Sequence, residues 1–144
     1  MKTLISAMAI SAIFFLSNNI QSQSNALTID ITNIKDLKSD IHVQLFNQHQ
    51  HFPKPPFASE IIIKPNGKNK VTASFPGIET GSYAVIVYQD SNGNGKFDRN
   101  FIGIPKEPYA LSQNFHPKMS SPTFEECKVV FGPNKTAFSL EMNN

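Results

Sequence analysis

Hydrophobic and polar residues alternate with a period of two along most of the chain. Leu27, Ile29 and Ile31 alternate with polar neighbours, which predicts a half-buried strand over residues 26–34. Further segments predict strands at 41–45, 61–63, 71–75, 83–88, 127–131 and 137–142, with turn-forming residues between them. The pattern favours an antiparallel β-sandwich of the immunoglobulin-like type with about seven strands. A small closed barrel is the alternative.

Two polar segments that contain prolines interrupt this alternation. Residues 47–59 and 101–123 contain several prolines, which bar regular strand pairing. A long irregular region is therefore expected near 90–125. His49 and His51 lie in the first segment at a spacing that suits a zinc or copper pair, although a polar proline-rich loop favours two solvated histidines.

The N-terminus has the pattern of a secretory signal peptide. Lys2 precedes an apolar run over residues 4–16, and small residues follow at Ser22, Ser24 and Ala26. The run is too short to span a bilayer comfortably. We expect a signal peptide at 1–24, a single domain at 25–144, and a periplasmic or secreted bacterial protein that has no stable membrane insertion after cleavage.

The net charge limits the classes of partner, and the cysteine content limits how the fold can be stabilised. The net charge is +2, and it falls to +1 when Lys2 is removed with the signal peptide. Such a balance predicts no nucleic-acid partner. Cys127 is the only cysteine, so the domain has no internal disulfide and depends on its hydrophobic core.

Residues 90–98 contain the strongest chemical signal of the chain. The sequence is Asp-Ser-Asn-Gly-Asn-Gly-Lys-Phe-Asp, with side-chain oxygens at alternate positions and a glycine at position 6. This is the first part of a calcium loop of the EF-hand type. The predicted ligands of a Ca²⁺ ion are Asp90, Asn92, Asn94, the carbonyl of Lys96, and Asp98.

The match to a calcium loop is partial. Phe101 stands at position 12, where the full motif has a bidentate glutamate, and Glu107 could complete the site if the chain folds back. Low ligand charge predicts weak affinity, with a dissociation constant on the order of 10⁻⁴ to 10⁻³ M. A metal-free turn is the alternative, because Asp, Asn and Gly also form tight turns.

Several consecutive motifs resemble one bacterial family. They are Gly-Ser-Tyr-Ala-Val at 81–85, the 90–98 loop, Gly-Ile-Pro-Lys-Glu at 103–107 and Ser-Pro-Thr-Phe-Glu at 121–125. Together they resemble the exported proteins grouped as domain of unknown function 2141, over essentially the whole mature chain. The resemblance implies an exported β-sandwich and no particular activity. Two glycines that the family usually has after Glu107 are replaced here by Pro108 and Ala110.

Three hypotheses for function follow. The first is a non-enzymatic binding or accessory module with a protein or glycan partner and a calcium-organised loop. The second is a small-molecule or glycan binder with a metal-free loop, which would use the aromatic residues Phe97, Phe101, Tyr109 and Phe115. The third is a hydrolase, which has little support because the chain contains no nucleophile motif, and Cys127 is predicted to be structural.

Overall fold

A computed structural model describes residues 26–47, 52–118 and 120–144. The predicted signal peptide at 1–24 and the histidine pair, His49 and His51, lie outside these residues. No helix in the described part of the chain is long and apolar enough to cross a membrane.

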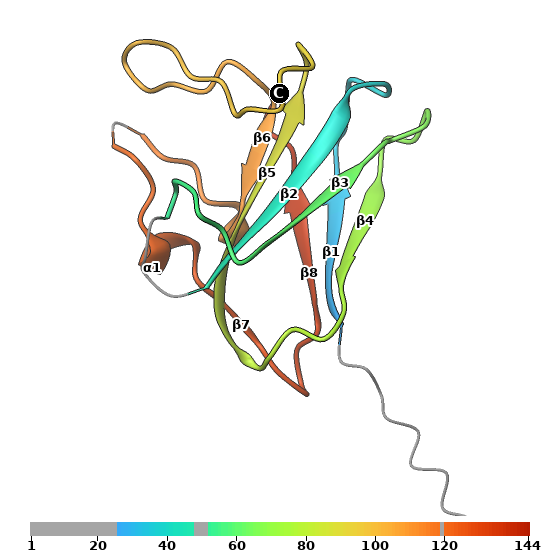
Figure 1. Ribbon diagram of the computed structural model, residues 1–144, viewed down its shortest axis with the longest axis vertical. Coiled ribbons are helices and arrows are strands. Elements are labelled where there is room, and N and C mark those ends of the chain that lie inside the picture. The colour runs from blue at the N-terminus through green and yellow to red at the C-terminus, as the bar shows by residue number, and fades with distance from the viewer. Residues whose placement is uncertain (1–25, 48–51, 119) are drawn as a thin grey trace, which may run out of the picture.

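Eight strands in the described part of the chain form two sheets (Figure 1). The strands are β1 (Leu27–Thr32), β2 (Asp40–Asn47), β3 (Ser59–Ile63), β4 (Val71–Phe75), β5 (Gly81–Asp90), β6 (Tyr109–Leu111), β7 (Val129–Phe131) and β8 (Ala137–Glu141). One sheet has the order β4-β1-β8; the other has the order β3-β2-β5-β6, and β7 also pairs with β5. The predicted β-sandwich is confirmed, and the two sheets do not close into a barrel.

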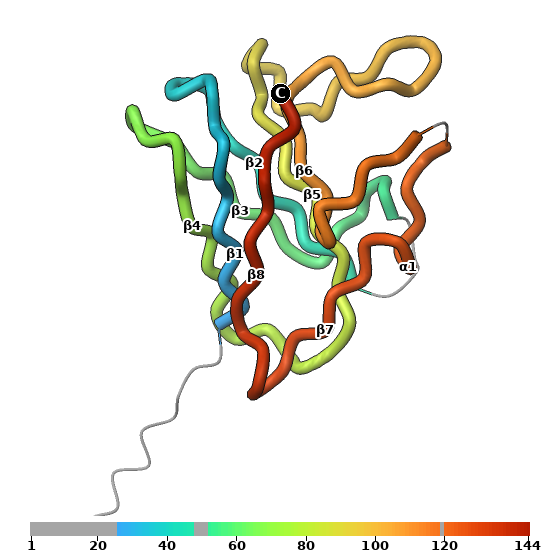
Figure 2. The backbone as a smooth tube through the Cα atoms, turned by 180° about the vertical axis from the view of Figure 1, so that it is seen from behind, coloured from blue at the N-terminus to red at the C-terminus, as the bar shows by residue number. Residues whose placement is uncertain are grey.

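One strand pair departs from the expected antiparallel arrangement. β1 and β8 are parallel, with Ile29 opposite Phe138, whereas every other pair of these strands is antiparallel. Figure 2 shows β8 beside β1, with β4 on the other side of β1. The last strand of the chain therefore completes the sheet that the first strand began.

The main hydrophobic core lies between the two sheets. Ile29 and Ile31 of β1 pack in the same cluster as Val43 and Leu45 of β2 and Val85 of β5. Residues that alternate with these in β1 are only partly buried. The alternation in the sequence thus arises because one face of each of these strands is directed to the core.

The five-stranded sheet is covered on its second face as well. Phe46, Ile86 and Tyr88 pack there against Phe124 and Cys127. β5 is consequently buried along nearly its whole length, which explains its continuous apolar run. Phe124 comes from the 90–125 region that the sequence predicted to be irregular, and Cys127 from the strand predicted at 127–131.

That prediction was wrong for two parts of the 90–125 region. Tyr109–Leu111 forms β6, which pairs with β5, and Ser112–Asn114 forms a 3₁₀ turn. Pro108 does not prevent the pairing because its carbonyl accepts a hydrogen bond from the backbone NH of Gln89 at 2.9 Å. A proline immediately before a strand costs no ladder hydrogen bond.

The strand predicted at 127–131 begins two residues later than expected. Phe124–Cys127 forms the short helix α1, and β7 starts at Val129. Thr123 caps the helix: its side chain accepts from the NH of Glu126, and the Glu126 carboxylate accepts from the NH of Thr123. This capping box outweighs the strand preference of the following residues.

The 90–98 loop and the following hairpin lie at one end of the sandwich, beside the C-terminus (Figure 1). The hairpin closes through the bridge between Arg99 and Pro105. The C-terminus is fixed there because Tyr109 and Asn143 exchange two backbone hydrogen bonds, at 3.1 and 2.7 Å. This end of the molecule therefore gathers the residues that the sequence singled out.

Candidate functional site

Asp90 is the last residue of β5, and the following loop wraps around its buried carboxylate. Oδ1 accepts from the backbone NH groups of Gly93 at 2.8 Å and Asn94 at 3.1 Å, and Oδ2 accepts from Gly95 at 2.7 Å. Gly93 and Gly95 both have positive φ, which residues with a Cβ adopt only under strain. Burial alone would raise the pKa of Asp90, but the three NH donors and nearby His42 hold it below its usual value.

Asn92, Asn94 and Asp98 converge on the outer side of the loop. Oδ2 of Asp98 accepts from the side-chain amide of Asn92 at 2.6 Å and from that of Asn94 at 2.8 Å. The amide oxygen of Asn92 accepts from the NH of Asn94, and that of Asn94 accepts from the NH of Lys96 at 2.8 Å. The structure thus brings three of the predicted ligands together, while Asp90 and Lys96 are joined to them through the loop backbone.

Glu107 folds back onto the loop, and Phe101 does not. The Glu107 carboxylate is buried, and its two oxygens accept from the NH of Ser91 at 3.0 Å and the NH of Asp98 at 3.1 Å. Phe101 is 99 % exposed and lies at the tip of the hairpin. Glu107 therefore brings a carboxylate from further along the chain to the loop, and backbone NH groups of the loop occupy both of its oxygens.

His42 and Glu60 support the loop from the neighbouring strands, and sequence reasoning did not identify this role. Nδ1 of His42 lies 3.1 Å from a carboxylate oxygen of Glu60, and Nε2 lies 3.9 Å from Oδ2 of Asp90. The His42 ring stacks on Tyr88 with the ring centroids 4.7 Å apart. His42, Glu60 and Asp90 meet because of the registers between β2 and β3 and between β2 and β5. Their positions along the chain therefore do not predict the contact.

The donor set of the loop limits the metals that it suits. Within the described residues, no group of three or more His, Cys, Asp or Glu side chains is arranged to hold a metal ion. A site here would consist of two carboxylates with amide and backbone oxygens. Oxygen donors of this kind suit a hard cation such as Ca²⁺ and do not suit zinc or copper.

A row of adjacent aromatic rings connects the loop to a neighbouring cleft. Phe97 lies 5.1 Å from Tyr88 and 5.9 Å from Tyr109, measured between ring centroids, and the guanidinium carbon of Arg99 lies 5.0 Å from the Phe97 ring centroid. Phe97 and Tyr109 line a cleft of about 460 Å³. Of the four aromatic residues predicted for ligand binding, these two meet, whereas Phe101 is at the hairpin tip and Phe115 packs in the second core cluster.

Ser112 and Cys127, two residues of nucleophilic type near the cleft-forming segments, have structural contacts. Ser112 is buried, its hydroxyl accepts from the NH of Val85 at 2.9 Å, and it donates to the carbonyl of Cys127. Burial, with a contribution from nearby Glu126, raises the pKa of the Cys127 thiol to about 12. A thiol with this pKa is protonated at neutral pH and is a poor nucleophile.

Comparison with known proteins gives one match. No curated protein and no solved structure matches the chain. A family model described as an uncharacterized protein conserved in bacteria, domain of unknown function 2141, covers residues 29–139. This range contains every strand from β2 to β7, the 90–98 loop and the cleft. The chain therefore belongs to the family of domain of unknown function 2141.

Proposed function

We propose that the protein is an exported, non-enzymatic binding module of bacteria, in which a calcium ion organises the 90–98 loop. Export to the periplasm or beyond is supported by the signal-like N-terminus, and the single cysteine favours a bacterial protein over a cysteine-rich eukaryotic secreted domain. The observation that carries the calcium proposal is the convergence of Asn92 and Asn94 on one carboxylate oxygen of Asp98.

The two asparagine amides explain how the same residues would serve a cation. Turning a side-chain amide by about 180° exchanges its NH₂ group for its carbonyl oxygen. Asn92 and Asn94 would then direct two oxygens toward a Ca²⁺ ion beside Asp98. In this movement the NH of Lys96 loses its partner, whereas the NH of Asn94 keeps its bond to Oδ1 of Asp90. Both residues are exposed, so water replaces the lost acceptors at low cost.

Charge around the loop also favours a cation. The carboxylates of Asp90 and Asp98 flank it, and Glu107 lies beneath it with both oxygens on loop NH groups. Such a site would bind calcium weakly, with a dissociation constant on the order of 10⁻⁴ to 10⁻³ M. The ion would fix the loop that leads directly to Phe97 and Arg99, and so it would order one wall of the cleft.

Thermal unfolding of residues 25–144 with and without calcium tests the proposal. For a dissociation constant near 10⁻⁴ M, about 10 mM calcium adds roughly 2.7 kcal/mol of stability. The melting temperature should then rise by several degrees. Magnesium should raise it less, because this smaller ion requires a tighter octahedral shell.

Two substitutions make the test specific for the loop. Asp98→Asn keeps the size of the side chain and removes the charge, so it should abolish the calcium-dependent shift. Glu79→Gln removes an exposed carboxylate outside the loop and should leave the shift intact. Equal melting temperatures of the unaltered protein with and without calcium would sink the proposal.

A second candidate function is supported by the cleft itself. Phe97, Tyr109 and the hairpin surround enough space for a small molecule whether or not the loop holds a metal. In this alternative the protein is a small-molecule binder with a metal-free loop. Ligand binding that persists unchanged in a calcium chelator, together with no effect of calcium on melting, would favour it.

A further inference from the structure

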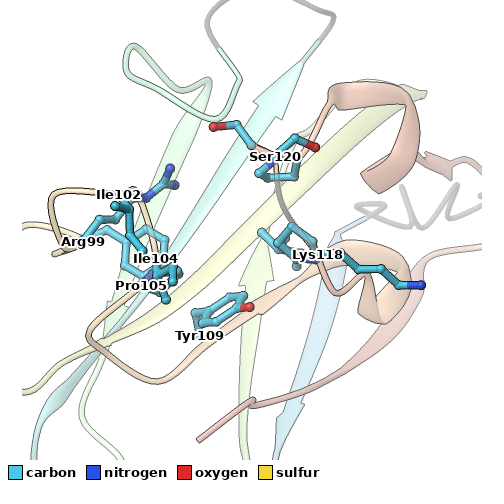
Figure 3. Close-up of a pocket in the computed structure, with 13 residues that line it drawn as sticks. Arg99, Ile102, Ile104, Pro105, Tyr109, Lys118 and Ser120 are labelled. Carbon is cyan, nitrogen blue, oxygen red and sulfur yellow. The ribbon is translucent and has the colours of Figure 1, made fainter.

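The cleft beside the 90–98 loop lies between the 99–105 hairpin and residues 117, 118 and 120–122 (Figure 3). Its volume of about 460 Å³ is within the range of roughly 300–1,000 Å³ typical of small-molecule sites. Figure 3 shows the Tyr109 ring between Ile104 and Pro105 on one side and Lys118 on the other. β6 supplies Tyr109 and Leu111, so this part of the cleft rests on the sheet.

The walls of the cleft are apolar and partly uncovered. Ile102 is 64 % exposed and Ile104 is 54 % exposed, and both line the cleft. Leu111 and three prolines add further apolar surface. A ligand with an apolar body would remove this surface from water, which is the main favourable term in binding to such sites.

Arg99 gives the cleft its charge. It is the only arginine of the chain, it is half-buried, and its guanidinium lies over the Phe97 ring. Burial lowers the pKa of Arg99, yet a guanidinium remains protonated at physiological pH. Among the described residues, no carboxylate forms a salt bridge with Arg99 and no acceptor hydrogen-bonds to its guanidinium. A partly desolvated cation without a counter-ion favours an anionic ligand.

The lining argues against a sugar as the ligand. Recognition of several sugar hydroxyl groups usually relies on Asp and Glu carboxylates, which accept, and on Asn and Gln amides, which both donate and accept. None of the described residues that line the cleft is of these types. The charged side chains in the lining are Arg99 and Lys118, and Figure 3 shows Lys118 extending away from Arg99. The lining therefore favours an anionic group near Arg99, with the hydroxyl groups of Tyr109, Ser120 and Ser121 as its neutral polar side chains.

We propose that the cleft binds a small amphiphilic carboxylate, with its apolar body against Ile102, Ile104 and Tyr109 and its carboxylate paired with Arg99. The fork of a guanidinium matches a carboxylate in a bidentate pair. This inference rests on the binding role in the proposed function, for which it names the ligand class, and it does not require calcium in the 90–98 loop.

Titration of residues 25–144 with 4-phenylbutyrate, followed by nuclear magnetic resonance of the backbone amides, tests the inference. We expect saturable shifts at the amides of Arg99, Ile104 and Tyr109. The neutral 4-phenylbutanol has the same apolar body and should bind roughly tenfold more weakly or worse, because it lacks the charge-assisted bonds. Equal affinity for the acid and the alcohol, or no saturable shift up to about 10 mM acid, overturns the inference.

Variants of Arg99 and Lys135 test which cation pairs with the carboxylate of the ligand. They also distinguish this inference from the calcium proposal. Arg99→Gln should weaken binding of the acid by roughly tenfold or more, and Arg99→Lys by less. Lys135→Gln removes a cation that stacks on Phe138 outside the cleft and should change nothing. Unchanged binding to Arg99→Gln overturns the inference. If calcium leaves melting unaltered while the acid still binds through Arg99, the calcium proposal fails and the carboxylate site stands.

Discussion

The carboxylate of Glu107 accepts a hydrogen bond from the backbone NH of Asp98 at 3.1 Å. Its other oxygen accepts from the NH of Ser91 at 3.0 Å, so one buried side chain holds both ends of the 90–98 loop. The NH of Lys106 donates to the carbonyl of Asp98 at 2.9 Å and strengthens the same connection. Glu107 therefore links the loop to the start of β6, which forms part of the cleft.

Replacing Glu107 by Gln should destabilise the fold. Gln has one acceptor oxygen, so either the NH of Ser91 or that of Asp98 loses its partner. Loss of a hydrogen bond to a charged group costs about 1.5–3 kcal/mol. Urea denaturation should show a lower midpoint with an unchanged slope. Glu79→Gln, at an exposed carboxylate, should remain close to the unaltered protein, and equal midpoints for the two variants would contradict this role of Glu107.

Stability should depend on the ionisation of Asp90 at acid pH. The folded-state pKa of Asp90 is below its usual value of about 3.8, so its contribution is complete above that pH. The contribution is lost as the pH falls through the folded-state pKa. The unaltered protein should therefore be more stable than Asp90→Asn at neutral pH, and the gap should narrow below about pH 4.

Denaturation of both proteins between neutral pH and about pH 2 measures that gap. The pKa is also lowered in three other carboxylates, namely Asp30, Asp36 and Glu126. These groups titrate in both proteins, so their contributions to stability cancel in the comparison. A gap that stays constant over the whole range would show that the Asp90 charge contributes nothing to stability.

Cys127 should be inert toward thiol reagents in the folded protein. The side chain is fully buried in the second core cluster, and its pKa is raised to about 12. Labelling with a chromogenic disulfide reagent at about pH 8 should be negligible before unfolding and stoichiometric in guanidinium chloride. Rapid labelling of the native protein would mean that the 112–128 segment opens readily from the sheet.

The sequence predicted those parts of the fold that depend on local pattern. Strands such as Leu27–Thr32 and Val71–Phe75 have one face on the core, so alternation marks them. β6 was missed because only three of its residues pair and Pro108 precedes it. The prolines correctly indicated irregular backbone on either side of β6. Residues 109–111 nevertheless form a strand because they pair with β5, which the local sequence does not reveal.

The candidate site likewise contains residues that the local sequence indicated and residues that only the fold brings together. Of the five ligands predicted from their spacing, the side chains of Asn92, Asn94 and Asp98 lie together. The Asp90 carboxylate, at the same spacing, is instead occupied by backbone NH groups of the loop. The contact of His42 with Asp90 could not be predicted from the sequence because it depends on the register of β2 and β5. Arg99 lies in no recognisable sequence motif. Its proposed role in binding follows from its partial burial without a counter-ion, which only the folded structure shows.

A calcium titration followed by amide resonances tests the central proposal most directly, since it reports both binding and its location. The amides of Gly93, Gly95 and Lys96 should shift saturably, with a dissociation constant on the order of 10⁻⁴ to 10⁻³ M, and Asp98→Asn should remove the shifts. Resonances of β1 and β4, in the other sheet, should stay unchanged. If the loop amides of the unaltered protein do not move up to about 10 mM calcium, the 90–98 segment is a metal-free turn and the calcium proposal is wrong.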